Sequence, residues 1–585
     1  MAKRIGIFVA WPYANGDLHL GHVAGVYLPA DIFARYHRLR GNQVLMVSGS
    51  DAHGTPITVA ADREGVSPEE IFRRYHHRFL ETYRRLGVSF DLFTHTHTEN
   101  HVAVSQDIFR TLNERGYLFT RTQTQFYCEY DRRFLPDRYV EGTCPYCGYP
   151  NARGDQCDNC GRTLDATELI DPRCRLCGRT PVLRETEHFF FDLPAFSDQL
   201  LEYIERQVHW RPNVQNFVRN FIQEGLKPRP VSRDLDWGVP IPVAGYEHKV
   251  MYVWFEAVIG YLSASIEWAR HHGDGESWEA WWRDPSARGY YFIGKDNIPF
   301  HALIWPAELM GYDRSLNLPY DIPASEFLNL EGQQFSTSRN WAVWVPDFLD
   351  RYAPDPLRDY LTSIAPETRD SEFTWQGFVE RNNNELLATW GNLVNRVVSF
   401  AYRNFEGRVP EPGQLSARDR NLLDQIGQGF AAVGALYERV ELKAAQREAM
   451  ALAREVNRYL DEKAPWFQIR ENREAAATTI FVALRAIDSL KLLLSPVLPF
   501  SSEQVHHFLG YESPLFGEQV IEPGTATGGH EVLTYRPAAS EGEDRWKPSE
   551  LEPGRTLRQP VVLYQKLDES VVEEERQRLL VQARS

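Results

Sequence analysis

The chain has 585 residues, of which 43% are hydrophobic and 25% are charged, a globular composition that excludes a mainly disordered protein and predicts several domains. The formal net charge is −16, so a nucleic-acid partner has to bind at a local basic patch. No apolar stretch reaches the ~18 residues of a membrane span, and the run after Lys3 and Arg4 is too short for a signal peptide. We therefore expect a cytoplasmic protein with no membrane partner.

The first fifty residues predict a strand–helix–strand unit. Residues 4–11 read as a buried strand, and a turn-rich loop follows from Pro12 to Asp17. An amphipathic helix is expected from Leu18 to Leu39, and residues 44–48 form a second apolar strand. This βαβ order is typical of a Rossmann-type parallel sheet in an α/β fold.

The middle of the chain predicts an insertion that splits the α/β domain. Residues 123–186 are rich in Cys, Gly, Pro and Arg and have few apolar runs, so we expect metal to hold them together. Strand-like runs return at residues 249–255 and 289–293. The sheet is therefore expected to continue after the insertion.

The last third is expected to be mostly helical. From residue 385 to 509 the pattern predicts a helix bundle, for example over residues 475–494. Residues 520–560 predict an irregular tail, and a charged helix is expected at 567–583. We expect no further domain after that helix, which favours a monomer.

These observations divide the chain into six predicted units. They are a first half of the α/β domain (1–118), a cysteine-rich insertion with zinc knuckles (119–235), a second half of the α/β domain (236–330), a linker (331–384), a helical domain (385–530) and a C-terminal tail (531–585).

Two histidines stand where the first strand passes into the first helix. His19 and His22 are three residues apart and share one face of the first helical turn, where free N–H groups already favour phosphate. Gly21 has no side chain, so a flat base could pack closely against the backbone there. The alternative is a pair of capping or surface histidines.

Two other arrangements resemble catalytic motifs and are rejected. Ser50, Asp51 and His53 are too close in sequence to converge as a hydrolase triad, and no G-x-S-x-G elbow exists. The stretch from Gly289 to Asp296 nearly spells a phosphate-binding loop, but Asp296 stands where Ser or Thr would hold magnesium.

The seven cysteines predict zinc sites and not disulfides, because six of them form three C-x-x-C pairs in a long chain without a secretion signal. Two pairs at short spacing predict one tetrahedral site, made of Cys144, Cys147, Cys157 and Cys160. A C-x-x-D sequence offers a second set, made of Cys128, Asp131, Cys174 and Cys177. The alternative is that only the first site is filled. Both sites would be structural, because neither leaves an open coordination position.

Several motifs together resemble a known family. They are Ala10-Trp-Pro-Tyr-Ala-Asn-Gly-Asp-Leu-His-Leu-Gly-His22, Ser50-Asp-Ala-His-Gly-Thr-Pro56, Tyr252-Val-Trp-Phe-Glu-Ala-Val-Ile-Gly-Tyr261 and Phe292-Ile-Gly-Lys-Asp-Asn-Ile-Pro-Phe-His301. The sequence is similar, over almost its whole length, to the methionyl-tRNA synthetase family of class I aminoacyl-tRNA synthetases. This resemblance implies that methionine is activated by Mg-ATP and transferred to the 3′ end of initiator and elongator tRNA(Met).

The resemblance also implies the site residues. The catalytic residues would be His19, His22 and Arg339. ATP would be bound by His19, Gly21, His22, Gly294, Lys295, Asp296 and Thr337. Methionine would be bound by Ala10, Trp11, Tyr13, Asp51, Trp254, Ala257, Tyr261, Asn297 and His301. Family members carry one or two zinc ions in the insertion.

The resemblance makes the split α/β domain the catalytic domain and the helical domain (385–530) the anticodon-binding domain, and it implies that the helical domain contains the anticodon readers. Asn392 and Arg396 are four residues apart on one helix face, and Trp466 follows a proline at an expected helix start. Aromatic stacking with Arg and Asn hydrogen bonds can read single-stranded bases. From the residues alone, a buried Trp and a surface Asn–Arg pair of an ordinary bundle would be preferred; the family match reverses that preference.

One stretch departs from the family. Where these synthetases carry K-M-S-K-S, this chain has Gln334-Phe-Ser-Thr-Ser338 followed by Arg339, so Gln334 and Thr337 replace both lysines. This signature loop (residues 334–339) raises one alternative, a tRNA-binding paralogue with weakened or lost adenylation. A non-catalytic zinc-ribbon nucleic-acid-binding module is a further alternative, but it leaves the nucleotide motifs unexplained.

Overall fold

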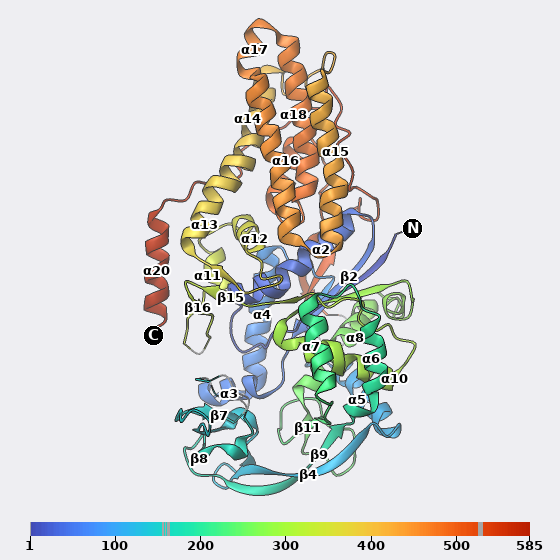
Figure 1. Cartoon of the computed structure of the whole chain (residues 1–585), viewed down its shortest axis with the longest axis vertical. Coiled ribbons are helices and arrows are strands. Elements are labelled where there is room, and N and C mark those ends of the chain that lie inside the picture. Colours follow the sequence, from blue (N-terminus) through green and yellow to red (C-terminus); the bar gives the residue numbers. More distant parts are fainter. Residues whose placement is uncertain are drawn as a thin grey trace.

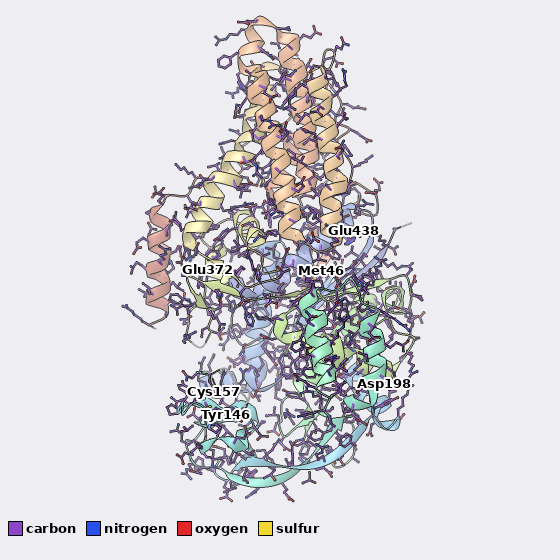
Figure 2. The ribbon with its side chains drawn as sticks, in the orientation of Figure 1. Met46, Tyr146, Cys157, Asp198, Glu372 and Glu438 are labelled. Carbon is purple, nitrogen blue, oxygen red and sulfur yellow. The ribbon has the colours of Figure 1, made fainter. Side chains whose placement is uncertain are left out.

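A computed structural model describes residues 2–154, 157, 159–160, 164–337, 339–524 and 530–584. Figure 1 shows an elongated molecule with the insertion at one end, a central sheet with its helices, and a helix bundle at the other end. Figure 2 shows Tyr146 and Cys157 together in the insertion and Glu438 at the base of the bundle. Within the described residues, no helix has the length and hydropathy to cross a bilayer.

A seven-stranded sheet forms the centre. In spatial order its strands are β14 (Ala324–Ser325), β13 (Arg288–Gly294), β1 (Arg4–Val9), β2 (Gln43–Ser50), β3 (Leu92–His95), β19 (Glu531–Arg536) and β18 (Glu518–Pro523). The first five are parallel to one another, β19 is antiparallel to β3, and β18 is antiparallel to β19. Strand β1 is buried and is paired on both sides, which explains its nearly continuous apolar run.

Helices cover this sheet. They are α1 (Leu20–His22), η1 (Val23–Tyr27), α2 (Leu28–Leu39), α3 (Thr55–Glu64), α4 (Pro68–Leu86), α5 (Glu99–Glu114), α8 (Val253–His271), α9 (Glu279–Trp282), η5 (Lys295–Asn297), η6 (Phe300–Ile304) and α10 (Trp305–Tyr312). The turns α1, η1 and α2 follow one another directly, so the helix expected over residues 18–39 runs from Leu20 to Leu39.

The insertion contains its own small sheets. Its elements are β4 (Leu118–Cys128), β5 (Arg133–Phe134), η2 (Asp137–Tyr139), β6 (Val140–Thr143), β7 (Ala152–Arg153), η3 (Ala166–Glu168), β8 (Ile170–Cys174), β9 (Val182–Phe191), η4 (Leu193–Phe196), α6 (Ser197–Glu205), α7 (Pro212–Gln223), β10 (Arg229–Pro230) and β11 (Ser232–Arg233). Strand β11 pairs with β12 (Val250–Met251), which follows the insertion in sequence. The long antiparallel pair β4–β9 leads from the core to the cysteine-bearing end (Figure 1).

The linker and bundle complete the chain. Their elements are β15 (Leu328–Leu330), β16 (Gln333–Gln334), α11 (Val345–Leu349), α12 (Pro354–Ser363), β17 (Ser371–Phe373), α13 (Trp375–Arg381), η7 (Asn382–Gly391), α14 (Asn392–Asn404), α15 (Ala417–Glu438), α16 (Leu442–Lys463), α17 (Pro465–Glu471), α18 (Arg473–Leu494), α19 (Pro499–Phe508) and α20 (Ser570–Gln582). Helices α15, α16 and α18 pack side by side. The helical run from α13 through α14 crosses residue 385 without a break, at the expected domain boundary.

Buried charges join the catalytic domain to the linker. The Asp31 carboxylate on α2 accepts hydrogen bonds from Arg35 at 2.9 Å and from Arg358 on α12 at 2.6 Å. These guanidinium groups lower the pKa of Asp31 to about 2, against the effect of burial. The contact fixes α12, and with it the linker, against the first helix of the sheet domain.

Two expectations about secondary structure are wrong. Only Val250–Met251 of the run 249–255 is a strand, because helix α8 already begins at Val253. Its β-branched and aromatic residues are buried on most sides of a helix, which removes the alternation that would mark it. The tail expected over 520–560 is not wholly irregular, since β18 and β19 extend the central sheet beyond β3.

Candidate active site and metal centres

The predicted small-molecule site lies at the carboxyl ends of three adjacent parallel strands. The loop after β1 carries Ala10 to His22, the loop after β2 carries Asp51, and the turn after β13 carries Gly294 to His301. The strand order reverses direction around β1, and α/β sheets bind ligands in the crevice at such a point. The fold therefore brings three of the four sequence motifs to one edge.

The two signature histidines cap the first helix. His19 is its N-cap, and its Nδ1 accepts a hydrogen bond from the Gly21 N–H at 3.1 Å. The Nδ1 of His22 accepts from the His19 N–H at 3.3 Å, and the two rings stack with centroids 3.7 Å apart. Burial lowers the pKa of His22 to about 4, and burial together with His22 holds the pKa of His19 well below its usual range. Both imidazoles are thus neutral at pH 7, and each carries its proton on Nε2 as a donor.

The signature loop contacts these histidines. The Phe335 ring stacks on His19 at a centroid distance of 4.7 Å. The Leu20 N–H donates to the Val343 carbonyl at 3.1 Å, and the Val345 N–H donates to the Leu18 carbonyl at 2.8 Å. The two motifs, more than three hundred residues apart in sequence, therefore form one surface.

The other predicted ATP residues differ in how free they are to contact a ligand. A side chain built at Gly294 would meet no atom within 4 Å, so the backbone there is open to close approach. Lys295 forms ion pairs with Glu326 at 2.8 Å and Asp370 at 3.0 Å, and burial raises the pKa of Asp296. Thr337 and Arg339 are exposed on the loop, and Ser338 lies outside the described residues.

Trp11 forms a tightly packed wall of the predicted methionine pocket. A Cβ built at Gly49 would lie 2.2 Å from its Cζ3 atom, and one built at Gly260 would lie 2.6 Å from its Cζ2 atom. Tyr13 meets Trp254 edge to face, with centroids 6.1 Å apart. These rings are partly exposed, as are Ala10, Ala257 and Asn297. On α8, Trp254, Ala257 and Tyr261 share one face by their spacing.

A buried hydrogen-bond chain fixes another wall. His301 Nδ1 donates to the Asn297 carbonyl at 2.9 Å, so its Nε2 accepts from the Tyr261 hydroxyl at 2.7 Å. Burial lowers the pKa of His301 to about 4 and raises that of Tyr261 well above its usual range. Both groups are therefore neutral, which suits an apolar thioether.

Asp51 is the acidic residue of the predicted methionine set. The residue is 3% exposed, and its carboxylate accepts a hydrogen bond from the His53 N–H at 3.2 Å. Burial and then the nearby Glu256 carboxylate raise the pKa of Asp51 well above its usual range. Such a carboxylate gains from a cationic partner, and a substrate ammonium group would provide one.

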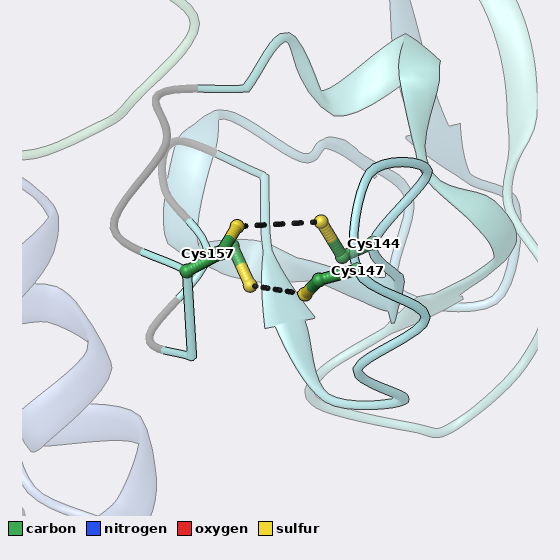
Figure 3. A group of neighbouring side chains, drawn as sticks. Cys144, Cys147 and Cys157 are labelled. Atoms are coloured by element: carbon green, nitrogen blue, oxygen red, sulfur yellow. Dashed lines mark hydrogen bonds between the residues drawn. The ribbon is translucent and has the colours of Figure 1, made fainter.

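The cysteines form the two predicted four-residue clusters. In the first, the Sγ atoms of Cys144 and Cys160 are 3.9 Å apart and those of Cys147 and Cys157 are 3.6 Å apart. Figure 3 shows the side chains of Cys144, Cys147 and Cys157 pointing toward a common centre. Metal–sulfur bonds of about 2.3 Å give a tetrahedron with edges of roughly 3.8 Å, which matches these spacings.

The second cluster includes the predicted aspartate. Asp131 Oδ2 lies 3.0 Å from Cys128 Sγ and 3.1 Å from Cys174 Sγ, and Cys128 and Cys177 are 3.5 Å apart. In each cluster the four donor atoms lie within 4.8 Å of one another. All seven cysteines are unpaired by disulfides, as expected. The donor chemistry of both sets fits Zn²⁺.

The predicted anticodon residues lie on α14 and at the start of α17 in the bundle. The Arg396 guanidinium lies over the Trp466 ring at 4.7 Å, and Trp466 meets Phe400 edge to face. Asn392 is exposed at the start of α14, four residues before Arg396. The next residue after Trp466, Phe467, is 76% exposed. The structure thus brings Arg396 and Trp466 into direct contact.

The sequence did not indicate several residues of this site. Glu256 is fully buried and accepts hydrogen bonds from His53 at 2.8 Å and His101 at 2.5 Å, behind the predicted pocket. An acidic residue inside an apolar helical stretch was the available signal. Phe335 was visible only as part of the altered loop, and its contact with His19 depends on the tertiary fold.

Comparisons with known proteins agree with this arrangement. The family model described as tRNA synthetases class I (M) matches residues 5–398, and that of the anticodon binding domain of methionyl tRNA ligase matches residues 409–532. A methionine–tRNA ligase of Thermomicrobium roseum is 82% identical over 100% of both chains, and one of Roseiflexus castenholzii is 54% identical over 100% of both. A solved structure of Mycobacterium tuberculosis methionyl-tRNA synthetase in complex with methionyl-adenylate is 25% identical, with a TM-score of 0.74, covering 96% of this chain and 100% of the other.

Proposed function

The chain belongs to the methionyl family of class I tRNA synthetases, and from this premise we propose that it is a methionine–tRNA ligase. It activates methionine with ATP to methionyl-adenylate and then transfers the methionyl group to tRNA. One observation of the structure carries the proposal. The neutral donors His19 and His22 follow β1 and the buried Asp51 follows the neighbouring β2, so the proposed phosphate and ammonium sites lie at the same sheet edge.

In the first step, a carboxylate oxygen of methionine attacks the α-phosphorus of ATP in line, and pyrophosphate leaves with the electron pair of the broken P–O bond. Asp51 holds the ammonium group, and Tyr261 and His301 offer a neutral wall to the thioether. The Nε2–H groups of His19 and His22 donate to the phosphate as charge builds there. The exposed Arg339 supplies the cation that Gln334 and Thr337 do not.

In the second step, a terminal ribose hydroxyl of the tRNA attacks the carbonyl carbon of the adenylate, and AMP leaves. Magnesium accompanies ATP as part of the substrate. The paralogue alternative, based on Gln334 and Thr337, is not supported, because full-length relatives are described as methionine–tRNA ligases.

We assign zinc to both cysteine clusters as a structural ion. Thiolate and carboxylate donors at tetrahedral spacing support it, and four protein ligands leave no position for catalysis. Bound zinc would cross-link segments of the insertion next to the small hydrophobic cluster that includes Tyr139 and Val140.

We assign reading of the tRNA(Met) anticodon, in initiator and elongator tRNA alike, to Asn392, Arg396 and Trp466. The contact between the partly exposed Trp466 ring and the exposed Arg396 guanidinium supports this role. We also propose that one chain is sufficient for activity, because all the proposed site residues belong to it. A reducing, cytoplasmic location is supported by the seven free thiols.

The test is amino-acid-dependent ATP–pyrophosphate exchange with methionine, leucine and isoleucine, followed by charging of tRNA(Met) and of the same tRNA with an altered anticodon. Exchange with methionine alone and charging that depends on the anticodon are expected. Exchange that prefers another amino acid, or no exchange, would contradict the proposal.

A further inference from the structure

The C-terminal helix α20 is firmly attached to the linker. Its buried residues Val572, Glu575 and Leu579 recur at helical spacing and form one face. Glu575 is 3% exposed, and its two carboxylate oxygens accept from the Arg351 guanidinium at 2.8 and 2.9 Å. Figure 1 shows α20 beside α13, with its C-terminal end toward β16.

From this anchor, α20 contacts the residues on both sides of the signature loop, within the segment 331–342. At the first end, the Arg576 guanidinium pairs with the Glu331 carboxylate at 3.1 Å. At the second end, Gln582 Nε2 donates to the carbonyls of Asn340 at 2.9 Å and Ala342 at 2.8 Å. The Asn340 side chain in turn donates to the Gln582 carbonyl at 3.0 Å.

The two held positions have unusual backbone conformations. Glu331 has a φ of 46° and Asn340 a φ of 51°, in the left-handed region that residues other than glycine rarely adopt. Such conformations persist only where surrounding contacts fix them. The bonds from Arg576 and Gln582 are contacts of this kind.

The held segment leads directly to the nucleotide motif. Ala342 is bonded by Gln582, and the next residue, Val343, accepts the Leu20 N–H beside His19. Phe335, within the same loop, stacks on His19. A short chain of bonds therefore connects the end of α20 with the histidines that would face the phosphates.

We propose that helix α20 positions the signature loop for ATP, with Gln582 as the principal positioning residue and Arg576 as its counterpart at the other end. The kinetic consequence rests on the proposed function, but the effect of the α20 contacts on the loop can be measured without activity. Gln582 touches no substrate and acts through Asn340 and Ala342. In a chain whose loop lacks both family lysines, the placement of the remaining cation, Arg339, then depends on α20.

The main variant is Gln582→Ala, which removes the donor to both carbonyls. With two hydrogen bonds lost, we expect the adenylation rate constant or the KM for ATP to worsen by about tenfold, and the KM for methionine to change by less than about twofold. Gln582→Glu should be at least as impaired, because it places carboxylate oxygens against carbonyl oxygens. The matched control is Gln577→Ala on the same helix, where the glutamine is exposed and bonds to Glu573.

A readout independent of catalysis separates this inference from the proposed function. Amide hydrogen exchange of peptides covering residues 328–345 should accelerate in Gln582→Ala and stay at the parent rate in Gln577→Ala. Arg576→Ala should accelerate exchange around Glu331. This variant tests the same role if the Gln582 variants fail to fold. A parent enzyme without pyrophosphate exchange would refute the proposed function and leave this measurement intact.

The positioning role is overturned if loop exchange does not change in Gln582→Ala. It is also overturned if the KM values for ATP and methionine rise in parallel together with a lower Tm. That pattern would mean that α20 only stabilises the fold.

Discussion

The packing of Trp11 against Gly260 makes the predicted methionine pocket testable by adding a single methyl group. Gly260 lies inside helix α8, where alanine is normally the better helix former by about 1 kcal/mol. A Cβ at this position would, however, lie 2.6 Å from Cζ2 and 2.7 Å from Cε2 of Trp11. Gly260→Ala therefore acts on the indole and not on the helix.

The size of the effect follows from the contact distances. Carbon atoms pack at about 3.5 Å or more, so the indole has to move by roughly 1 Å. It already lies against Gly49, where a Cβ would be 2.2 Å from Cζ3, so that side offers no free space. Overpacking of this kind costs about 1–3 kcal/mol. Helix propensity offsets about 1 kcal/mol of this cost in folding stability, but it does not relieve the displacement of the indole in the pocket. We expect the KM for methionine to rise roughly tenfold or more.

The assay is methionine-dependent ATP–pyrophosphate exchange, with methionine and ATP varied separately. The KM for ATP should stay close to the parent value. Gly427→Ala is the matched control, since it lies in helix α15 and its Cβ would meet Pro548 at an ordinary 3.6 Å. An unchanged methionine KM in Gly260→Ala, with normal folding by calorimetry, would refute the assignment of Trp11 to the pocket.

Four further results are expected. Trp466→Ala should lower kcat/KM for tRNA charging about ten- to a hundredfold, because one stacking contact is lost, and leave pyrophosphate exchange intact. Phe217→Ala removes an exposed aromatic outside the bundle and should change neither. Methionine binding should tighten as pH rises through the raised pKa of Asp51. Below pH ~7, where the ligand amine stays charged, calorimetry should show that binding releases protons from Asp51. Both effects should vanish in Asp51→Asn. Metal analysis should find two zinc ions per chain, and Asp131→Ala should lose one of them; a single zinc in the parent would exclude the second site. Gln334→Lys should raise the adenylation rate constant roughly tenfold with little change in methionine affinity, and no gain would show that this exposed position does not serve the phosphates.

The sequence by itself determined the features that depend on neighbours along the chain. The spacing of His19 and His22 at a strand-to-helix junction was sufficient to place them on one helical turn, where the structure finds them stacked. The C-x-x-C pairs and the C-x-x-D at Cys128 predicted two donor sets, and in the structure the four donor atoms of each set lie close to one another. The bundle followed from its 3.6-residue periodicity.

Only the tertiary structure decided which distant segments meet. Strands β18 and β19 follow the whole bundle in sequence, yet β19 pairs with β3 and β18 pairs with β19, and no local pattern marks that edge as open. The run at Val253 has strand-like residues but forms a helix, because its surroundings bury it on most sides. Glu256 between two histidines, and Gln582 at the signature loop, are likewise invisible in local spacing. Such contacts join residues far apart in the chain, and the burial of the assembled domains, which no short window of sequence contains, selects them.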